Sequence, residues 1–189
     1  MFNAKLRNQI RKAKKSGLQF VVGHLEILDG FYAVFARNMR DLGTPVYGKS
    51  FFRNILEVFP DIRRIFAVYH ETRMIAAGIG SWFRNTLEIP WASSIRDSKC
   101  SVLTICYWEA IRFTIRNGLN RLDFGRSTPN EGTYNFKKQW GAQPVQLQWQ
   151  YLMEACNMIP DLSPSNPKYQ AAIRIWQRLP LPQPAYLGR

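Results

Sequence analysis

The densest group of side chains that can do chemistry lies between residues 123 and 141. Asp123 brings a carboxylate that can orient a neighbouring guanidinium or take a proton from an attacking amine. The planar guanidinium group of Arg126 can bind a phosphate or a carboxylate, and Lys137 has a compact positive charge. On spacing alone a second interpretation stays open, in which the same residues form a salt-bridged, capped turn that closes a sheet.

The sequence around this group predicts how it is held. Residues 121–125 are expected to form a short strand, and residues 133–140 a short helix with Phe136 and Trp140 on one face and Lys137 on another. Residues 128–131, Thr-Pro-Asn-Glu, read as a capping box with proline at the first helical position. A loop between a strand end and a helix start is where α/β proteins commonly place their sites.

Hydrophobic periodicity along the chain predicts an α/β fold with a mixed sheet. Further strands are expected at residues 18–22, 62–69, 74–83, 87–94 and 145–152, and further helices at residues 25–42, 50–59, with Ser50 as its cap, and 99–117. Polar tips separate the three central strands, which indicates an antiparallel meander. A helix and one more strand then place that last strand beside the meander through a crossover. Such a sheet can splay and leave a cleft for an extended acyl donor.

The segment after the meander departs from the glycine-rich pyrophosphate loop of acetyl-CoA enzymes. Residues 94–99 read Ser-Ile-Arg-Asp-Ser-Lys and contain no glycine. Arg96 and Lys99 are candidate substrate-binding residues that replace backbone donors with charge. A solvated turn is the alternative interpretation.

Composition and charge limit the class of protein. The 189 residues are 46% hydrophobic, which suits one folded domain, and the formal net charge of +13 predicts affinity for polyanions. Much of that charge lies in residues 1–17, a basic amphipathic helix with Leu6 and Ile10 on its apolar face. This helix is interpreted either as a solvated helix packed on the body or as a contact with tRNA, nucleotide phosphate or a membrane surface.

The sequence shows no secretory or membrane-spanning segment. The first 16 residues are polar and basic, and Glu109 and Arg112 interrupt the most apolar window. We therefore expect a cytoplasmic protein, either soluble or peripheral at the inner membrane surface.

Cysteine and histidine usage indicates neither a metal site nor a covalent intermediate. The three cysteines show no Cys-x-x-Cys spacing, and His24 and His70 lie far apart in the sequence. No serine or cysteine lies beside a histidine that can serve as its base. We expect no metal and no permanently bound cofactor.

Several motifs in order resemble a known family. They are Arg-Asn-Gln-Ile-Arg-Lys-Ala at 7–13, Glu-Ile-Pro-Trp-Ala-Ser-Ser at 88–94, Asp-Phe-Gly-Arg-Ser-Thr at 123–128, Phe-Lys-Lys-Gln-Trp-Gly-Ala at 136–142 and Trp-Gln-Arg-Leu-Pro-Leu-Pro at 176–182. Together they resemble FemAB-related proteins, and more narrowly the subgroup associated with exosortase (PEP-CTERM) and exopolysaccharide systems. The chain resembles the C-terminal half of such proteins.

The resemblance implies a fold of the acyl-CoA N-acyltransferase (GNAT) type. The single GNAT-like domain is expected at 18–155, between the basic helix at 1–17 and an appendage at 156–189 that the proline-rich composition beyond Pro160 predicts. That appendage is expected to hold one helix at 168–178, which docks on the domain through Ile173 and Trp176.

The resemblance also implies a function, the transfer of an acyl or aminoacyl group onto an amino group of a cell-envelope or exopolysaccharide precursor. The donor would be acyl-CoA or aminoacyl-tRNA. Lys137 of the Phe-Lys motif would lie by the reacting groups, with Asp123 and Arg126 as further catalytic residues. Trp91 and Phe136 would bind substrate.

Alternatives remain open because family members pair two GNAT-like halves. A separate chain or a second copy would supply the other half, or the single domain is active, or it is inactive. The alternative function is a non-catalytic basic half-domain that binds RNA, nucleotide-sugar phosphate or a partner subunit.

Overall fold

A computed structural model describes residues 2–95, 102–148, 150, 167–178 and 180. The described residues form a five-stranded sheet in the order β1-β2-β3-β4-β5. Its strands are β1 (Leu18–Gly23), β2 (Arg63–His70), β3 (Arg73–Phe83), β4 (Thr86–Ser94) and β5 (Arg121–Asp123). The first four strands run antiparallel to their neighbours, whereas β5 runs parallel to β4. The predicted mixed sheet and meander are confirmed.

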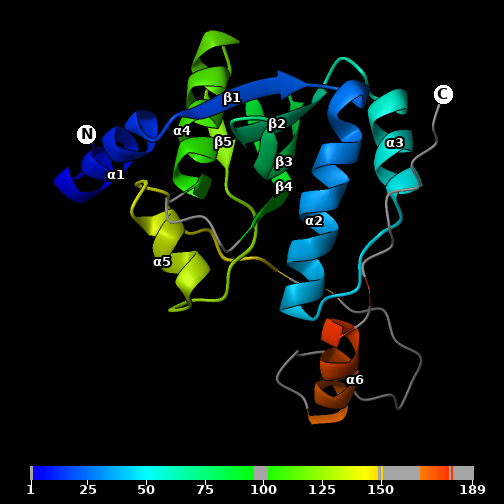
Figure 1. Ribbon diagram of the computed structural model, residues 1–189. Coiled ribbons are helices and arrows are strands. Elements are labelled where there is room, and N and C mark those ends of the chain that lie inside the picture. Colours follow the sequence, from blue (N-terminus) through cyan, green and yellow to red (C-terminus); the bar gives the residue numbers. More distant parts are fainter. Residues whose placement is uncertain (1, 96–101, 149, 151–166, 179, 181–189) are drawn as a thin grey trace.

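Helices cover both faces of this sheet (Figure 1). They are α1 (Ala4–Lys15), the 3-10 turn η1 (Leu25–Ile27), α2 (Leu28–Leu42), α3 (Lys49–Val58), α4 (Val102–Arg116), α5 (Gly132–Lys138) and α6 (Pro167–Arg178). Helix α4 is the crossover that returns the chain from β4 to β5, and it makes their parallel pairing possible.

Two apolar clusters hold the layers together, one on each face. On one face, Leu6 and Ile10 of α1 pack with α4 and with Phe66 of the sheet. On the other face, Phe31 of α2 and Phe52 of α3 pack on the sheet and are fully buried. Burying a side chain of this size contributes roughly 1.5–3 kcal/mol, so both helical layers are firmly attached.

Two predicted helix caps are wrong. Helix α3 begins at Lys49, with Gly48 in the cap position and no side-chain cap bond, so Ser50 lies inside the helix. The residues 128–131 do not form a capping box, because α5 begins only at Gly132 and Glu131 makes no side-chain cap bond. Asn130 has a φ of 67°, and this left-handed residue turns the chain before the helix can start.

The strand predicted at residues 145–152 is also wrong where the structure describes it. Residues 145–148 and 150 are not in a strand, and residues 149, 151 and 152 lie outside the described residues. Val145 and Leu147 are exposed rather than packed against a neighbour. Alternating apolar residues suit a pleated surface, but a strand forms only where a partner edge is available.

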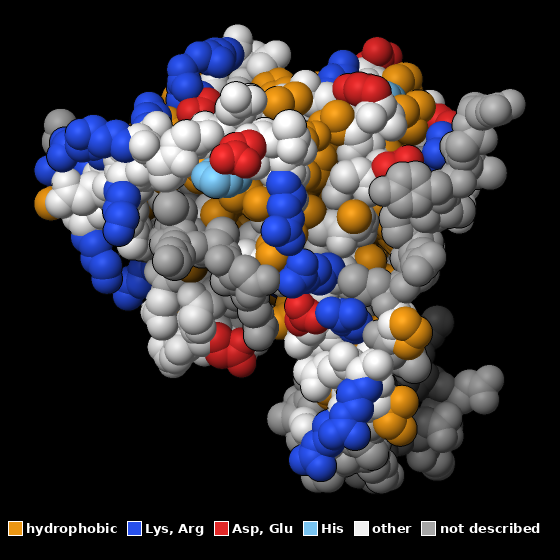
Figure 2. Space-filling view, in the orientation of Figure 1, with side chains coloured by type: hydrophobic (Ala, Val, Ile, Leu, Met, Phe, Trp, Pro, Cys, Tyr) orange, Lys and Arg blue, Asp and Glu red, His pale blue; other side chains and the backbone are white. Residues whose placement is uncertain are grey.

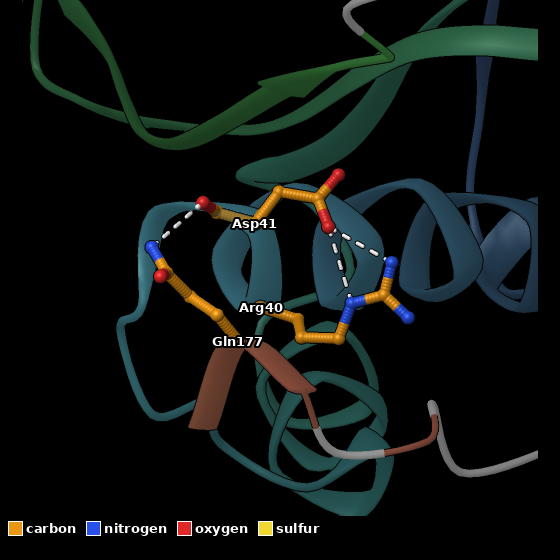
Figure 3. A network of polar contacts seen from close by, with 3 residues as sticks. All are labelled: Arg40, Asp41 and Gln177. Carbon is orange, nitrogen blue, oxygen red and sulfur yellow. Dashed lines mark hydrogen bonds and ion pairs between the residues drawn. The ribbon is translucent and has the colours of Figure 1, made fainter. Parts of the chain in front are cut away.

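Helix α6 docks on the C-terminal end of α2 (Figure 3). The Gln177 side-chain amide donates a hydrogen bond of 3.2 Å to the backbone carbonyl of Asp41, whose carboxylate pairs with Arg40 at 2.8 Å. Ile173 lies so close to Gly43 that a Cβ at Gly43 would come within 2.3 Å of the Ile173 methyl group. The predicted contact through Ile173 is therefore present, and Trp176 is half-buried. None of the helices in the described ranges is long and apolar enough to span a bilayer.

Candidate functional site

The candidate site forms where β5 ends. Asp123 is the last residue of β5, and the strand register places it opposite Glu88 of β4. Gly125 then adopts a φ of 68°, a backbone conformation that favours glycine, and turns the chain back. Its N–H donates a 2.7 Å hydrogen bond to Asp123 Oδ1. The turn therefore holds the Asp123 carboxylate beside Glu88 at the sheet edge.

Lys137 reaches the same turn from α5. Its Nζ donates hydrogen bonds to the backbone carbonyls of Gly125 at 3.0 Å and Arg126 at 2.6 Å. Partial burial lowers the pKa of Lys137, and the negative charge of Asp123 opposes that shift. An ammonium has three N–H donors, so these two bonds within the described residues leave one N–H for a further acceptor.

Phe136 attaches α5 to the body. Its ring lies 5.4 Å from the ring of Tyr107 on α4 and 6.2 Å from the ring of Trp140, between ring centres. Phe136 is half-buried, and Trp140 is buried. This packing fixes the angle at which Lys137, on the neighbouring face, meets the turn.

Glu88 is the residue that sequence reasoning missed. Partial desolvation raises the pKa of the Glu88 carboxyl, and the charge of Asp123 raises it further. A carboxylate with a raised pKa is a better proton acceptor than an ordinary glutamate at neutral pH. A signal was present in the sequence, because Glu88 is the acidic residue within the apolar run at 87–94. Its pairing with Asp123 depends on the parallel register of β4 and β5.

The structure gathers the three predicted catalytic residues in one place. Asp123 and Lys137 meet the same turn through their side chains, and Arg126 contributes its backbone carbonyl while its side chain is exposed. The arrangement combines two carboxylates that can accept a proton with a cation that can stabilise a developing negative charge.

Of the predicted substrate-binding residues, Phe136 lies on α5 next to Lys137, whereas Trp91 lies apart from this site. Trp91 packs on the opposite face of the sheet from Phe136, with its ring 5.8 Å from Phe51 and 5.5 Å from Phe52. Arg96 and Lys99 lie outside the described residues. The structure therefore does not bring Trp91 to the turn that Lys137 occupies.

Solved structures with similar folds include FemX and aminoglycoside acetyltransferases. The structure of FemX matches with a TM-score of 0.67 at 13% identity, over 74% of this chain and 54% of FemX. The aminoglycoside acetyltransferase AAC(6')-Iy, in complex with a bisubstrate analogue of CoA, matches with a TM-score of 0.56 at 11% identity, over 72% of this chain and 98% of that enzyme. The chain thus spans about half the length of FemX and nearly all of AAC(6')-Iy.

A third match is the C-terminal domain of a putative lysylphosphatidylglycerol synthetase from Agrobacterium fabrum. Its TM-score is 0.54 at 13% identity, over 65% of this chain and 40% of that one. At these identities the likeness shows the fold, and the expected GNAT-type fold is confirmed. No curated protein sequence matches this one.

The sequence itself gives the family. The model of the acetyltransferase (GNAT) domain matches residues 2–138, a range that contains Glu88, Asp123 and Lys137. This match covers well over half of the chain. The chain therefore belongs to the acetyltransferase (GNAT) domain family.

Proposed function

We propose that this protein is an N-acyltransferase that forms an amide by moving an acyl or aminoacyl group onto an amine. The observation that carries the proposal is the position of Lys137, bound to the turn after β5 beside the carboxylates of Asp123 and Glu88. Family membership supports the reaction class.

The geometry supports a direct attack. Glu88 takes a proton from the amine, and the amine nitrogen attacks the carbonyl carbon of a thioester or ester. The C–N bond forms, the C–S or C–O bond breaks, and the proton passes through the carboxylate to the departing thiolate or alkoxide. The remaining N–H of Lys137 faces the negative charge that develops on the carbonyl oxygen. Loss of one such donor typically costs about 3 kcal/mol in transition-state energy.

The donor is acyl-CoA or aminoacyl-tRNA in this proposal. AAC(6')-Iy has been solved with CoA and with a CoA bisubstrate analogue, which supports a CoA thioester. The likeness to FemX supports the aminoacyl alternative. The acceptor is an amino group of a cell-envelope or exopolysaccharide precursor, and the exosortase-associated subgroup rests on the sequence motifs alone.

The proposal is tested by detecting the product. The purified chain is incubated with acetyl-CoA, a longer acyl-CoA or aminoacyl-tRNA, each with an amino-sugar or peptide amine, and the amide is measured by mass spectrometry. We expect one donor class to give an amide that is absent without protein and strongly reduced in Glu88→Gln. Absence of amide with every donor would contradict the proposal.

A second candidate function is favoured by the surface of α1. Its buried residues Leu6, Ile10 and Ala13 face the body, whereas its basic side chains are exposed. The exposed set is Lys5, Arg7, Arg11, Lys12, Lys14 and Lys15. Figure 2 shows these cations gathered at one end of the molecule. The chain would then bind RNA as a basic module without catalysis.

The salt dependence of RNA binding tests this second candidate function separately from catalysis. Replacing Arg11 and Lys12 with alanine should weaken RNA binding and lower the slope of log affinity against log salt by about 0.9 for each lost phosphate contact. The matched control replaces Arg174 and Arg178 on α6, which are also exposed. Equal effects of both pairs would reject a specific role for α1. Competition by anionic vesicles would show that lipid headgroups occupy the same face.

A further inference from the structure

The outer edge of β1 pairs with no other strand in the part of the chain that the structure describes. β1 stands at the end of the strand order and, among the described residues, pairs only with β2. Figure 1 shows it running from α1 along the outside of the sheet towards α2. Proteins usually protect such edges with lysine, proline or a bulge, because unpaired N–H and C=O groups recruit another strand. The sequence of β1, Leu-Gln-Phe-Val-Val-Gly, contains neither a charge nor a proline.

Apolar side chains are exposed along this edge. Val21 and Val22 are each 38% exposed, and alternation places them on opposite faces of the sheet. Both valines have high strand propensity and lie next to the unpaired backbone groups. A strand added at this edge would bury them and satisfy those groups at the same time.

The two ends of β1 carry opposite charges. Lys12 and Lys15, both exposed, lie in the last turn of α1 just before the strand. Beyond Gly23 there is an open hollow of about 410 Å³, lined by the acidic residues Glu26 and Asp61 among others. Hydrogen bonding to the backbone N–H of His24 lowers the pKa of Glu26, so this carboxylate is charged at neutral pH.

The hollow also contains a cation, Arg64, one of whose guanidinium nitrogens is bound to backbone carbonyls within the chain. The Arg64 guanidinium donates to the backbone carbonyls of Pro60 and Arg63 and lies 5.9 Å from the Trp82 ring. Two carboxylates therefore face one guanidinium, and the hollow is acidic overall.

We propose that two copies of this chain associate through antiparallel pairing of their β1 edges, which forms one continuous sheet across the pair. A two-fold axis between the midpoints of the two β1 strands brings the Lys15 end of each copy to the acidic hollow of the other. At both ends of the paired strands, lysines of one copy then attract carboxylates of the other. A parallel alignment would place like charges together. Self-complementarity of this kind is what a two-fold interface requires.

The net charge of +13 on each copy opposes association but does not prevent it. At physiological salt the Debye length is about 8 Å, so charges far from the interface are largely screened. The valines and the paired ends lie within the interface itself, where the screening is weaker.

The first test is the mass in solution, measured by light scattering at physiological salt over a range of protein concentration. We expect the mass to rise to twice the chain mass of 22.0 kDa. Val21→Lys places a charge at the edge and should return the mass to that of one chain. The matched control is Ile175→Lys on α6, where Ile175 is 64% exposed and the helix packs on the C-terminal end of α2, away from β1. Circular dichroism confirms that each variant is folded.

Exchanging the charges of Lys15 and Asp61 tests whether the two β1 strands pair antiparallel. Lys15→Glu and Asp61→Lys should each weaken association, about fivefold or more for loss of a favourable charge pair. The double variant should restore it, because the two ends again carry opposite charges. A wild-type mass of 22.0 kDa at every concentration would overturn the proposal. An unchanged dimer in Val21→Lys, open-ended growth, or a double variant weaker than either single variant would overturn it too.

Discussion

The Lys137 ammonium donates hydrogen bonds to two backbone carbonyls of the turn at Gly125, a geometry that suits a lysine. An ammonium accommodates acceptors in several directions, whereas an arginine fork requires a planar arrangement. The carbonyls of Gly125 and Arg126 lie 3.0 Å and 2.6 Å from Nζ. The two bonds therefore fix the position of the cation in the structure.

The raised pKa of Glu88 predicts how turnover depends on pH. Its pKa is raised above the ordinary value of 4.5, so the ionised form that accepts a proton is lost as pH falls through the raised value. Turnover of the wild-type protein should fall on that acidic side. Glu88→Gln should reduce turnover by about 10²-fold and should remove that limb of the pH profile.

The contribution of Glu88 to the free energy of unfolding should depend on pH in the opposite sense to turnover. Because the folded pKa of Glu88 exceeds the unfolded value, its contribution to stability is present below the unfolded pKa and is lost as pH rises through the folded pKa. At neutral pH, Glu88→Gln should thus be at least as stable as the wild type by thermal unfolding. A variant that is both slower and markedly less stable would show that Glu88 has a structural role instead.

Sequence reasoning found part of this site. Asp123, Arg126 and Lys137 were predicted because reactive side chains crowd one strand-to-helix segment, and the structure brings them to one turn. Glu88 was missed because it lies 35 residues from Asp123 in the sequence and meets it only through the register of β4 and β5. Local patterns carry no information about such a register.

At the scale of elements, α5 depends on one aromatic anchor. Phe136→Ala removes contacts with Tyr107 and Trp140. Because the ring is half-buried, we expect a loss of about 2 kcal/mol in the free energy of unfolding, below the range for a fully buried phenylalanine. Turnover should fall as Lys137 loses its fixed position. Chemical denaturation and steady-state kinetics measure the two effects.

The control for Phe136 is Phe83→Ala, since Phe83 is 72% exposed. It should change neither stability nor turnover. If Phe136→Ala instead raised KM and left stability unchanged, Phe136 would contact substrate, as the family resemblance implies, and would not act as an anchor.

Some elements could be read from the sequence and others could not. The meander was predictable because residues 62–94 form three apolar and aromatic runs separated by polar tips, and the place of β5 followed from the crossover. The pattern at residues 145–148 is just as strand-like, yet Val145 is 84% exposed and unpaired there. Periodicity describes one face of a strand, but pairing depends on an edge elsewhere in the fold.

At the scale of the whole molecule, the basic helix α1 lies close to the helix that carries Lys137, because the rings of Phe2, just before α1, and Trp140, just after α5, are 5.6 Å apart. The exposed cations of α1 lie at one end of the molecule, and the site combines Glu88 of β4, Asp123 of β5 and Lys137 of α5. A strongly basic surface raises the rate of encounter with polyanionic donors such as CoA or RNA. Neutralising α1 should then lower kcat/KM at low salt without changing kcat, and steady-state kinetics at two salt concentrations checks this.

The most direct test of acyl transfer at this site compares Lys137→Ala with Lys138→Ala. The two lysines are neighbours on α5, but Lys137 contacts the turn, whereas Lys138 is exposed. Lys137→Ala should lower kcat for amide formation by about 10²–10³-fold, whereas Lys138→Ala should leave it near the wild-type value, and both variants should stay folded. Equal kcat values for the two folded variants would contradict this prediction.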